Sequence, residues 1–217
     1  MFISFDIETG PLPLKKREFC RPEPDDISYG NLKDEAKRKI KYEAALKEWV
    51  DEGNALDETQ SQIVAIGWHT QDDGLQLRYA VDGMTEAKLL KEFWALCPKK
   101  DATLAGHYIA TFDLPFMIRR SMVLNVKFPM WVAAGIDGYR PDPELIFDTR
   151  LMWTFGNKNE HIKLKKLAAF CGYKCKTGDV AGKDFWKYLR DGKMKECDEY
   201  LGDDVMAVKA IFDKLWA

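Results

Sequence analysis

The chain has 217 residues, of which 46% are hydrophobic and 31% are charged, a balance typical of a folded globular protein. The formal net charge is -2, so no overall basic field exists, and a nucleic-acid partner must be held by local basic patches or through metal ions. No apolar run approaches the length of a membrane span, no signal-peptide pattern precedes the first strand, and the five cysteines are irregularly spaced. We therefore expect a reducing, intracellular and cytoplasmic location.

The first predicted element is a strand over residues 1–8, MFISFDIE. Its period of two places Asp6 and Glu8 on the same face, and two prolines soon end it. The apolar content of this strand favours a central position in a sheet, where two carboxylates on one face repel each other and lose hydration. A hard divalent cation with oxygen ligands resolves that conflict. The alternative is an edge strand with a solvent-facing side.

The elements that follow alternate between helices and strands. Residues 31–53 predict a charged amphipathic helix, which we interpret as part of an insertion at about 11–60 rather than a second domain. Further strands are predicted over 61–70, 75–81, 102–108 and within 143–153, and further helices over 85–97, 111–125, 163–172, 182–192 and 194–216. Together they predict one domain over residues 1–217, an α/β fold with a mixed five-stranded sheet flanked by helices.

Three more polar side chains are candidates for the same site. Asp113 directly follows Phe112 at the start of a predicted helix, where it could equally be an N-cap. Tyr200 and Asp204 are four residues apart and share one face of the last helix, beside its apolar stripe. Tyr200 could instead be an amphipathic residue at the edge of the core. Asp203 lies about 100° away around the helix and is expected to face solvent.

The segments FDIETG, HYIATFDLPF and YLGDDV, in this order, resemble the three motifs of the DEDD superfamily of 3′–5′ exonucleases, which has a ribonuclease H-like fold. Five residues match these motifs: Asp6 and Glu8 the first, Asp113 the second, and Tyr200 and Asp204 the third. The histidine branch has a histidine five residues before the last acid, where this chain has Glu199, so the resemblance is to the tyrosine branch. The chain is similar to stand-alone relatives of the exonuclease domain of family B DNA polymerases, which implies a bacterial or phage-encoded protein.

The resemblance implies catalysis with two divalent cations, and Mg²⁺ or Mn²⁺ suits ligands that are all carboxylates. The first ion would be held by Asp6, Glu8 and Asp204. Asp6 would bridge to the second ion, which Asp113 would hold. Tyr200 would orient the attacking water, because its ordinary pKa of about 10 makes it a poor base. The implied reaction is hydrolysis of phosphodiester bonds from the 3′ end of DNA, with single-stranded ends as the expected substrate.

Further side chains are candidates for substrate binding. Thr9, Tyr108 and Phe112 are expected to line a pocket for the terminal nucleotides, where aromatic rings can stack on bases. Many relatives have an asparagine at the position of Tyr108, so the resemblance does not assign its contacts. His107 is either a nucleotide contact or a structural residue at the end of a strand. Candidate phosphate contacts, which could also be solvated helix faces, are Arg119, Arg120, Lys163, Lys165 and Lys166.

Two other functions remain open at the level of the sequence. A 3′–5′ exoribonuclease on the same fold would differ only in a few contacts to the 2′ position of the sugar. A non-catalytic nucleic-acid-binding module is also an alternative, because a fold does not establish activity. The complete set of four acids and a tyrosine favours an enzyme. The sequence does not name a protein partner in replication, repair or recombination.

Overall fold

The computed structural model describes residues 1–51, 53–136, 141–155, 157, 159–175 and 180–216. Its elements in chain order are β1 (Phe2–Pro11), α1 (Leu14–Arg17), η1 (Glu18–Cys20), η2 (Pro24–Asp26), α2 (Glu35–Asp51), β2 (Ser61–Thr70), β3 (Gly74–Tyr79), α3 (Glu86–Ala95), β4 (Thr103–Gly106), α4 (Asp113–Val123), α5 (Met130–Gly135), β5 (Ile146–Asp148), α6 (Thr149–Trp153), α7 (Leu164–Phe170), η3 (Gly182–Asp184), α8 (Phe185–Arg190) and α9 (Met194–Leu215). The chain forms two compact units, Met1–Glu8 with Ile63–Ala217, and Thr9–Gln62. Within the described ranges, no helix is both long and apolar enough to cross a lipid bilayer.

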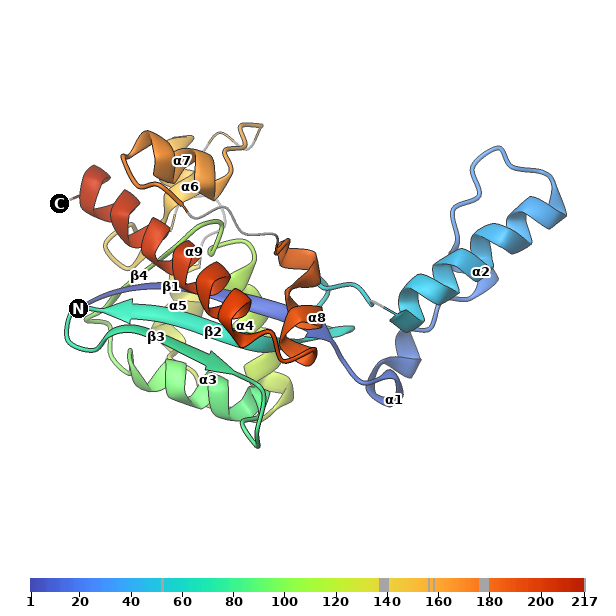
Figure 1. Ribbon diagram of the computed structural model, residues 1–217, viewed down its shortest axis with the longest axis horizontal. Coiled ribbons are helices and arrows are strands. Elements are labelled where there is room, and N and C mark those ends of the chain that lie inside the picture. The colour runs from blue at the N-terminus through green and yellow to red at the C-terminus, as the bar shows by residue number, and fades with distance from the viewer. Residues whose placement is uncertain (52, 137–140, 156, 158, 176–179, 217) are drawn as a thin grey trace. The chain divides into compact units, whose positions relative to one another are not determined.

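The first unit is built on a five-stranded sheet with the order β3-β2-β1-β4-β5, of which Figure 1 labels β1 to β4. Strands β2 and β3, predicted as strands over 61–70 and 75–81, form an antiparallel hairpin in which Ala65 lies opposite Tyr79. Strand β4 runs parallel to β1, with Thr103 opposite Phe2, and also parallel to β5. The mixed sheet is confirmed, and β1 lies at its centre. The alternative of an edge strand for Asp6 and Glu8 is therefore wrong.

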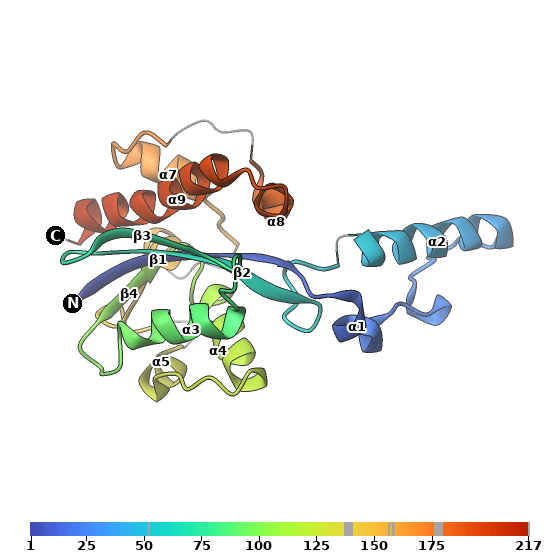
Figure 2. The ribbon, with the colours of Figure 1, turned by 60° about the horizontal axis from the view of Figure 1, so that its bottom comes forward.

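Helices cover both faces of this sheet. Figure 2 shows α3, α4 and α5 on one face and α7, α8 and α9 on the other. The odd-numbered residues of β1 are buried in the core beneath α3 and α4: Ile3, Phe5 and Ile7. On the opposite face, Phe2 stacks on Phe212 of α9 with ring centroids 3.9 Å apart. Because side chains alternate along a strand, Asp6 and Glu8 share the face of Phe2 and point toward α9.

Helix α9 packs closely on the sheet at Gly67 of β2. A Cβ atom at Gly67 would lie 2.9 Å from both Leu201 and Val205, so only glycine permits this approach. These two residues and Val208 are fully buried, as the apolar stripe predicts, whereas Leu215 in the last turn is 41% exposed. The close packing fixes the middle of α9, which carries Asp204, above the central strands.

The second unit has a small core of its own. Trp49 of α2 is buried, and the guanidinium of Arg17 lies 5.3 Å from the centroid of its ring. Ile40 is 65% exposed, so the predicted apolar face of this helix is buried only near Trp49. Residue 52, at the end of the predicted helix, lies outside the described residues. The bounds of the unit are close to the predicted insertion at about 11–60, and one domain over 1–217 stays a prediction.

Candidate active site

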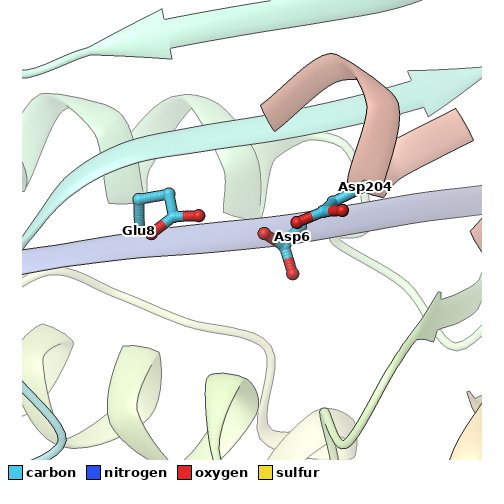
Figure 3. Close-up of side chains that lie close together, drawn as sticks. All are labelled: Asp6, Glu8 and Asp204. Carbon is cyan, nitrogen blue, oxygen red and sulfur yellow. The ribbon is translucent and has the colours of Figure 1, made fainter. Parts of the chain in front are cut away.

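Three carboxylates meet between β1 and α9. One oxygen atom from each of Asp6, Glu8 and Asp204 lies within 4.8 Å of the other two. Figure 3 shows the carboxylates of Asp6 and Asp204 close together, with that of Glu8 beside them along β1. Glu8 and Asp204 are buried, and Asp6 is partly exposed. The packing of a C-terminal helix on the first strand thus assembles a group whose members are almost 200 residues apart in the chain.

Asp113 contacts the backbone of the same strand. It is buried at the start of α4, and its carboxylate accepts a hydrogen bond from the backbone N–H of Ile7, between the two acids of β1. Strand β4 ends at Gly106, so Asp113 replaces the strand as the hydrogen-bonding partner of β1 beyond that point. The N-cap of α4 is Phe112, so the interpretation of Asp113 as a cap is wrong.

Burial raises the pKa of all four carboxyl groups, and repulsion by the other acids of the set raises the pKa of Asp6 and Glu8 further. Burial is the main cause of a pKa of about 7 for Asp113 and of about 6 for Asp204. The pKa of Asp6 is raised well above its ordinary value by burial, and further by Asp113, Glu8 and Asp204. The pKa of Glu8 is likewise raised by burial and then by Asp204 and Asp113. Four acids held this close favour a positive charge between them.

The chemistry of this donor set fits a hard divalent cation. Every candidate ligand is a carboxylate oxygen, as Mg²⁺ and Mn²⁺ prefer. In the part of the chain that the structure describes, the side chains placed to hold a metal ion together are Asp6, Glu8 and Asp204. This group contains no histidine or cysteine, so it does not resemble a zinc site. Asp113 lies outside that cluster but close enough to affect the pKa of Asp6 and Glu8.

Tyr200 and Lys165 lie against Asp204. The Tyr200 hydroxyl is hydrogen-bonded to the carboxylate of Asp204. The pKa of Tyr200 is raised by burial and then by the negative charges of the site, so its hydroxyl keeps its proton at neutral pH. The Nζ atom of Lys165 lies 5.3 Å from the centroid of the Tyr200 ring, and its charge lowers the pKa of Asp204. Of the predicted phosphate contacts, Lys165 is therefore placed beside the carboxylates.

The predicted substrate-binding residues occupy different surroundings. Both ring nitrogens of His107 have protein partners, the Thr149 hydroxyl at 2.8 Å and the Ile162 carbonyl at 2.9 Å, which favours the structural interpretation. Thr9 belongs to the second unit, where its hydroxyl donates to the Ala55 carbonyl at 2.7 Å.

The two aromatic candidates lie just before α4. Tyr108 is 40% exposed and has a positive φ of 72°, a strained conformation for a bulky residue. The guanidinium of Arg150 lies 4.4 Å from the centroid of its ring. Phe112 is partly buried and packs on Phe116 with ring centroids 5.6 Å apart. Tyr108 is thus the more accessible of these two rings.

Two predictions are wrong because neighbouring segments of the chain cover the side chains concerned. Arg120 is buried and donates to Glu86 of α3 at 2.8 Å and 2.7 Å, so it is not a phosphate contact. Asp203 is buried rather than solvated, and it accepts a hydrogen bond of 3.0 Å from the Tyr173 hydroxyl. The residues after α7 cover this side of α9, which the stripe on α9 alone does not reveal.

Asp148 is a polar residue of this region that the sequence did not single out. Its carboxylate accepts hydrogen bonds from the backbone N–H groups of Tyr108 and Ala110, both at 3.1 Å. The same side chain caps α6 by accepting from the N–H groups of Arg150 and Leu151. It thereby fixes the loop that leads to Asp113. An aspartate between a strand and a helix, as in IFDTR, is the sequence signal that could have identified it.

The comparisons with known proteins agree with this geometry. A family model described as a predicted 3′–5′ exonuclease related to the exonuclease domain of PolB matches residues 54–215, most of the chain. The chain belongs to this exonuclease family. The predicted membership is therefore confirmed.

A solved structure supports the fold of this family member. The family B DNA polymerase from the hyperthermophilic archaeon Pyrobaculum calidifontis is similar, with a TM-score of 0.59 and 15% sequence identity. The match covers 99% of this chain and 24% of the polymerase chain, so this chain spans about a quarter of the polymerase's length. At this identity the likeness shows the fold alone, which confirms the ribonuclease H-like α/β architecture. No curated protein sequence matches.

Proposed function

We propose that the chain is a metal-dependent exonuclease that hydrolyses phosphodiester bonds from the 3′ end of single-stranded DNA by a two-metal-ion mechanism. The observation that carries this proposal is the convergence of Asp6 and Glu8 of the central strand with Asp204 of α9, one oxygen atom of each lying within 4.8 Å of the others. Asp113, hydrogen-bonded to the backbone between the two acids of β1, completes the set. Membership of the exonuclease family supports the direction of hydrolysis.

The side chains of the site have separate roles in this proposal. Asp6, Glu8 and Asp204 would hold one divalent cation, and Asp6 and Asp113 would hold a second. The bound cations supply the positive charge that lowers the pKa of a water and stabilises the attacking and leaving oxygens. Tyr200, whose hydroxyl stays protonated, would orient that water by a hydrogen bond.

Other residues would supply the positive charge that binds the phosphate groups of the substrate and the aromatic rings that stack on its bases. Lys165 would contact a phosphate group, because it is the cation next to Tyr200 and Asp204. Tyr108, which is exposed, and Phe112 would contact the terminal bases. Roles in nucleotide binding for Thr9 and His107 stay predictions. Both side chains already make hydrogen bonds within the protein, and these bonds would have to break before either side chain could bind a nucleotide.

The test is degradation of a 5′-labelled single-stranded DNA oligonucleotide with Mg²⁺ or Mn²⁺. We expect a ladder that shortens from the 3′ end and is abolished by EDTA. Asp6→Asn removes a charge needed to hold the cations, and we expect the rate to fall by at least about 100-fold. Asp72→Asn, at an exposed turn residue, is the matched control and should keep the rate of the unchanged protein.

The alternatives are separated in the same assay. Faster degradation of an RNA oligonucleotide of matched sequence would favour the exoribonuclease. Binding of DNA and RNA without hydrolysis, with either cation, would favour the non-catalytic module. A DNA ladder that persists in Asp6→Asn would contradict the assignment of the metal ligands.

A further inference from the structure

A group of cations and aromatic rings lies on and around α8, outside the group of carboxylates. Residues 180–195 contain two acids and five basic side chains, namely Lys183, Lys187, Arg190, Lys193 and Lys195, whereas the chain as a whole has a net charge of -2. We infer that this surface binds the phosphodiester backbone of the substrate strand, along the part of the strand that extends away from the active site. The inference rests on the proposed function, and it names a contact surface that the catalytic motifs do not include.

The α8 patch consists of Lys183, Trp186, Lys187, Tyr188, Arg190 and Lys193. Two of its cations lie over the ring of Trp186, with Lys187 Nζ at 5.7 Å and the Arg190 guanidinium at 5.2 Å from the centroid. A third, Lys193 Nζ, lies 4.6 Å from the centroid of the Tyr188 ring. The rings are partly buried and restrict the motion of these long side chains, which lowers the entropy cost of binding a ligand.

The acids near the patch do not cancel its charge. Asp184 and Asp191 pair with Lys187 and Arg190 at 2.8 Å and 2.9 Å, and both pairs are partly or largely exposed. Ion pairs in such surroundings are weak and can be exchanged for phosphate. The first two turns of α9 carry the acids Glu196, Asp198 and Glu199, of which Asp198 accepts a hydrogen bond from the Tyr79 hydroxyl of β3. These acids limit the patch to α8 and its flanking residues.

The patch begins beside the candidate active site. The buried ring of Phe185, the first residue of α8, lies 5.9 Å from the ring of Tyr200. A Cβ atom at Gly182 would lie 3.1 Å from the Tyr200 hydroxyl. Since Tyr200 contacts Asp204, a strand whose end lies at the carboxylates can continue directly onto α8. A helix of six residues is about 9 Å long, a distance over which one strand presents about two or three phosphates at the spacing of a duplex.

A polyanionic strand is the ligand that these observations favour. The four buried acids of the site repel phosphates, so substrate affinity needs fixed cations nearby. A solvated helix face would leave its cations dispersed, whereas here they gather on two rings. An acidic protein surface could also meet these cations, but nothing about an acidic protein explains why they adjoin the residues around Tyr200.

The test measures binding of a single-stranded DNA oligonucleotide by fluorescence anisotropy at several salt concentrations. All the proteins compared also carry Asp6→Asn, so that the DNA stays intact. We expect the triple variant Lys183→Ala, Arg190→Ala and Lys193→Ala to bind at least about tenfold more weakly at 0.1 M salt, the slope of log K against log salt being reduced by about 2. The control replaces the same number of exposed lysines near α3 and α4, Lys91→Ala, Lys99→Ala and Lys127→Ala, and should leave the slope nearly unchanged.

The outcome is independent of the outcome for catalysis. A reduced slope in the α8 variant alone supports the patch, whether or not the unsubstituted protein degrades DNA. Equal slopes in the two triple variants overturn the inference, even if hydrolysis from the 3′ end is established, and would leave an acidic protein as the partner to examine. In an active protein, the α8 substitutions are expected to raise KM more than they lower kcat.

Discussion

At the scale of single residues, Tyr200 has neighbours from several segments of the chain. Its hydroxyl is hydrogen-bonded to Asp204, its ring meets Lys165 and Phe185, and the backbone of Gly182 lies beside its oxygen. Gly182 does not have a left-handed φ, so its backbone conformation does not require glycine. The space beside the tyrosine hydroxyl explains this glycine.

The substitution Gly182→Ala tests that explanation. The new Cβ would lie 3.1 Å from the Tyr200 oxygen, a contact tight enough to displace the hydroxyl by a few tenths of an ångström. We expect kcat to fall by about tenfold, because small misplacements of a positioning group are costly. Steady-state kinetics on the labelled oligonucleotide, together with a thermal melt, would measure the effect.

A second background makes this prediction specific. In the variant Tyr200→Phe the hydroxyl is absent, so adding Gly182→Ala should change kcat little. Gly135→Ala, whose Cβ would make an ordinary contact of 3.4 Å with Ile146, is the control for a glycine substitution elsewhere. An equal loss from Gly182→Ala with and without the hydroxyl would contradict a role through Tyr200.

At the scale of elements, a buried ion pair fixes α4, the helix that begins with Asp113. Glu86 of α3 binds Arg120 of α4 through two hydrogen bonds, and it also accepts the backbone N–H of Ile63 in β2 at 2.9 Å. The two charged side chains are only 6% and 7% exposed. A pair this buried contributes little net stability but joins three elements in one orientation.

Removing the acid from this pair should be strongly destabilising. In Glu86→Ala the buried Arg120 guanidinium loses this carboxylate, and we expect the free energy of unfolding to fall by about 3 kcal/mol. Urea unfolding would measure it. The comparison is Glu43→Ala, which breaks an exposed pair with Lys39 on α2 and should cost less than about 1 kcal/mol. Similar losses in both variants would show that the buried pair does not hold α4.

At the scale of the whole molecule, a net charge of -2 conceals a strong separation of charge within the first unit. Four acids are concentrated at the centre of the sheet, and the α8 patch concentrates cations nearby. Without cations the acids repel one another, so the fold sacrifices stability for the site. The metal-free protein should therefore respond to pH in an unusual direction.

The raised pKa values determine the sign of that response. These carboxyl groups bind protons more tightly in the folded state than in the unfolded state. Their protonation therefore stabilises the fold, and this contribution is fully present below the ordinary pKa values of 3.8 for aspartate and 4.5 for glutamate. It is lost as the pH rises through about 6 for Asp204 and about 7 for Asp113. We expect the melting temperature of metal-free protein to be higher at about pH 5.5 than at about pH 8.

Divalent cations should remove this dependence. Mn²⁺ is expected to raise the melting temperature more at about pH 8 than at about pH 5.5, because protons compete with it for the carboxylates. The variant Asp6→Asn, measured by the same thermal melts, should show smaller responses to both pH and Mn²⁺. A metal-free protein that becomes less stable on acidification over this range would contradict the predicted coupling.

The sequence by itself determined the features that depend on local repeats. The period of two along β1 places Asp6 and Glu8 on one face, and the spacing of four places Tyr200 beside Asp204. The order of the motifs identified the family and, through it, the α/β fold and the residues that the structure brings together. These features could be predicted because strand and helix geometry fixes the direction of nearby side chains whatever the rest of the fold.

Only the tertiary structure decided which of the remaining polar side chains are accessible. Arg120 and Asp203 are polar positions on amphipathic helices, yet α3 and the residues after α7 cover them. Asp148 binds the loop before Asp113 because β5 pairs with β4, a pairing that the sequence does not reveal. The α8 patch likewise acquires meaning because its neighbours Gly182 and Phe185 lie against Tyr200. Burial and neighbours come from packing between distant segments, and the period of a single segment does not record which of its faces another element will cover.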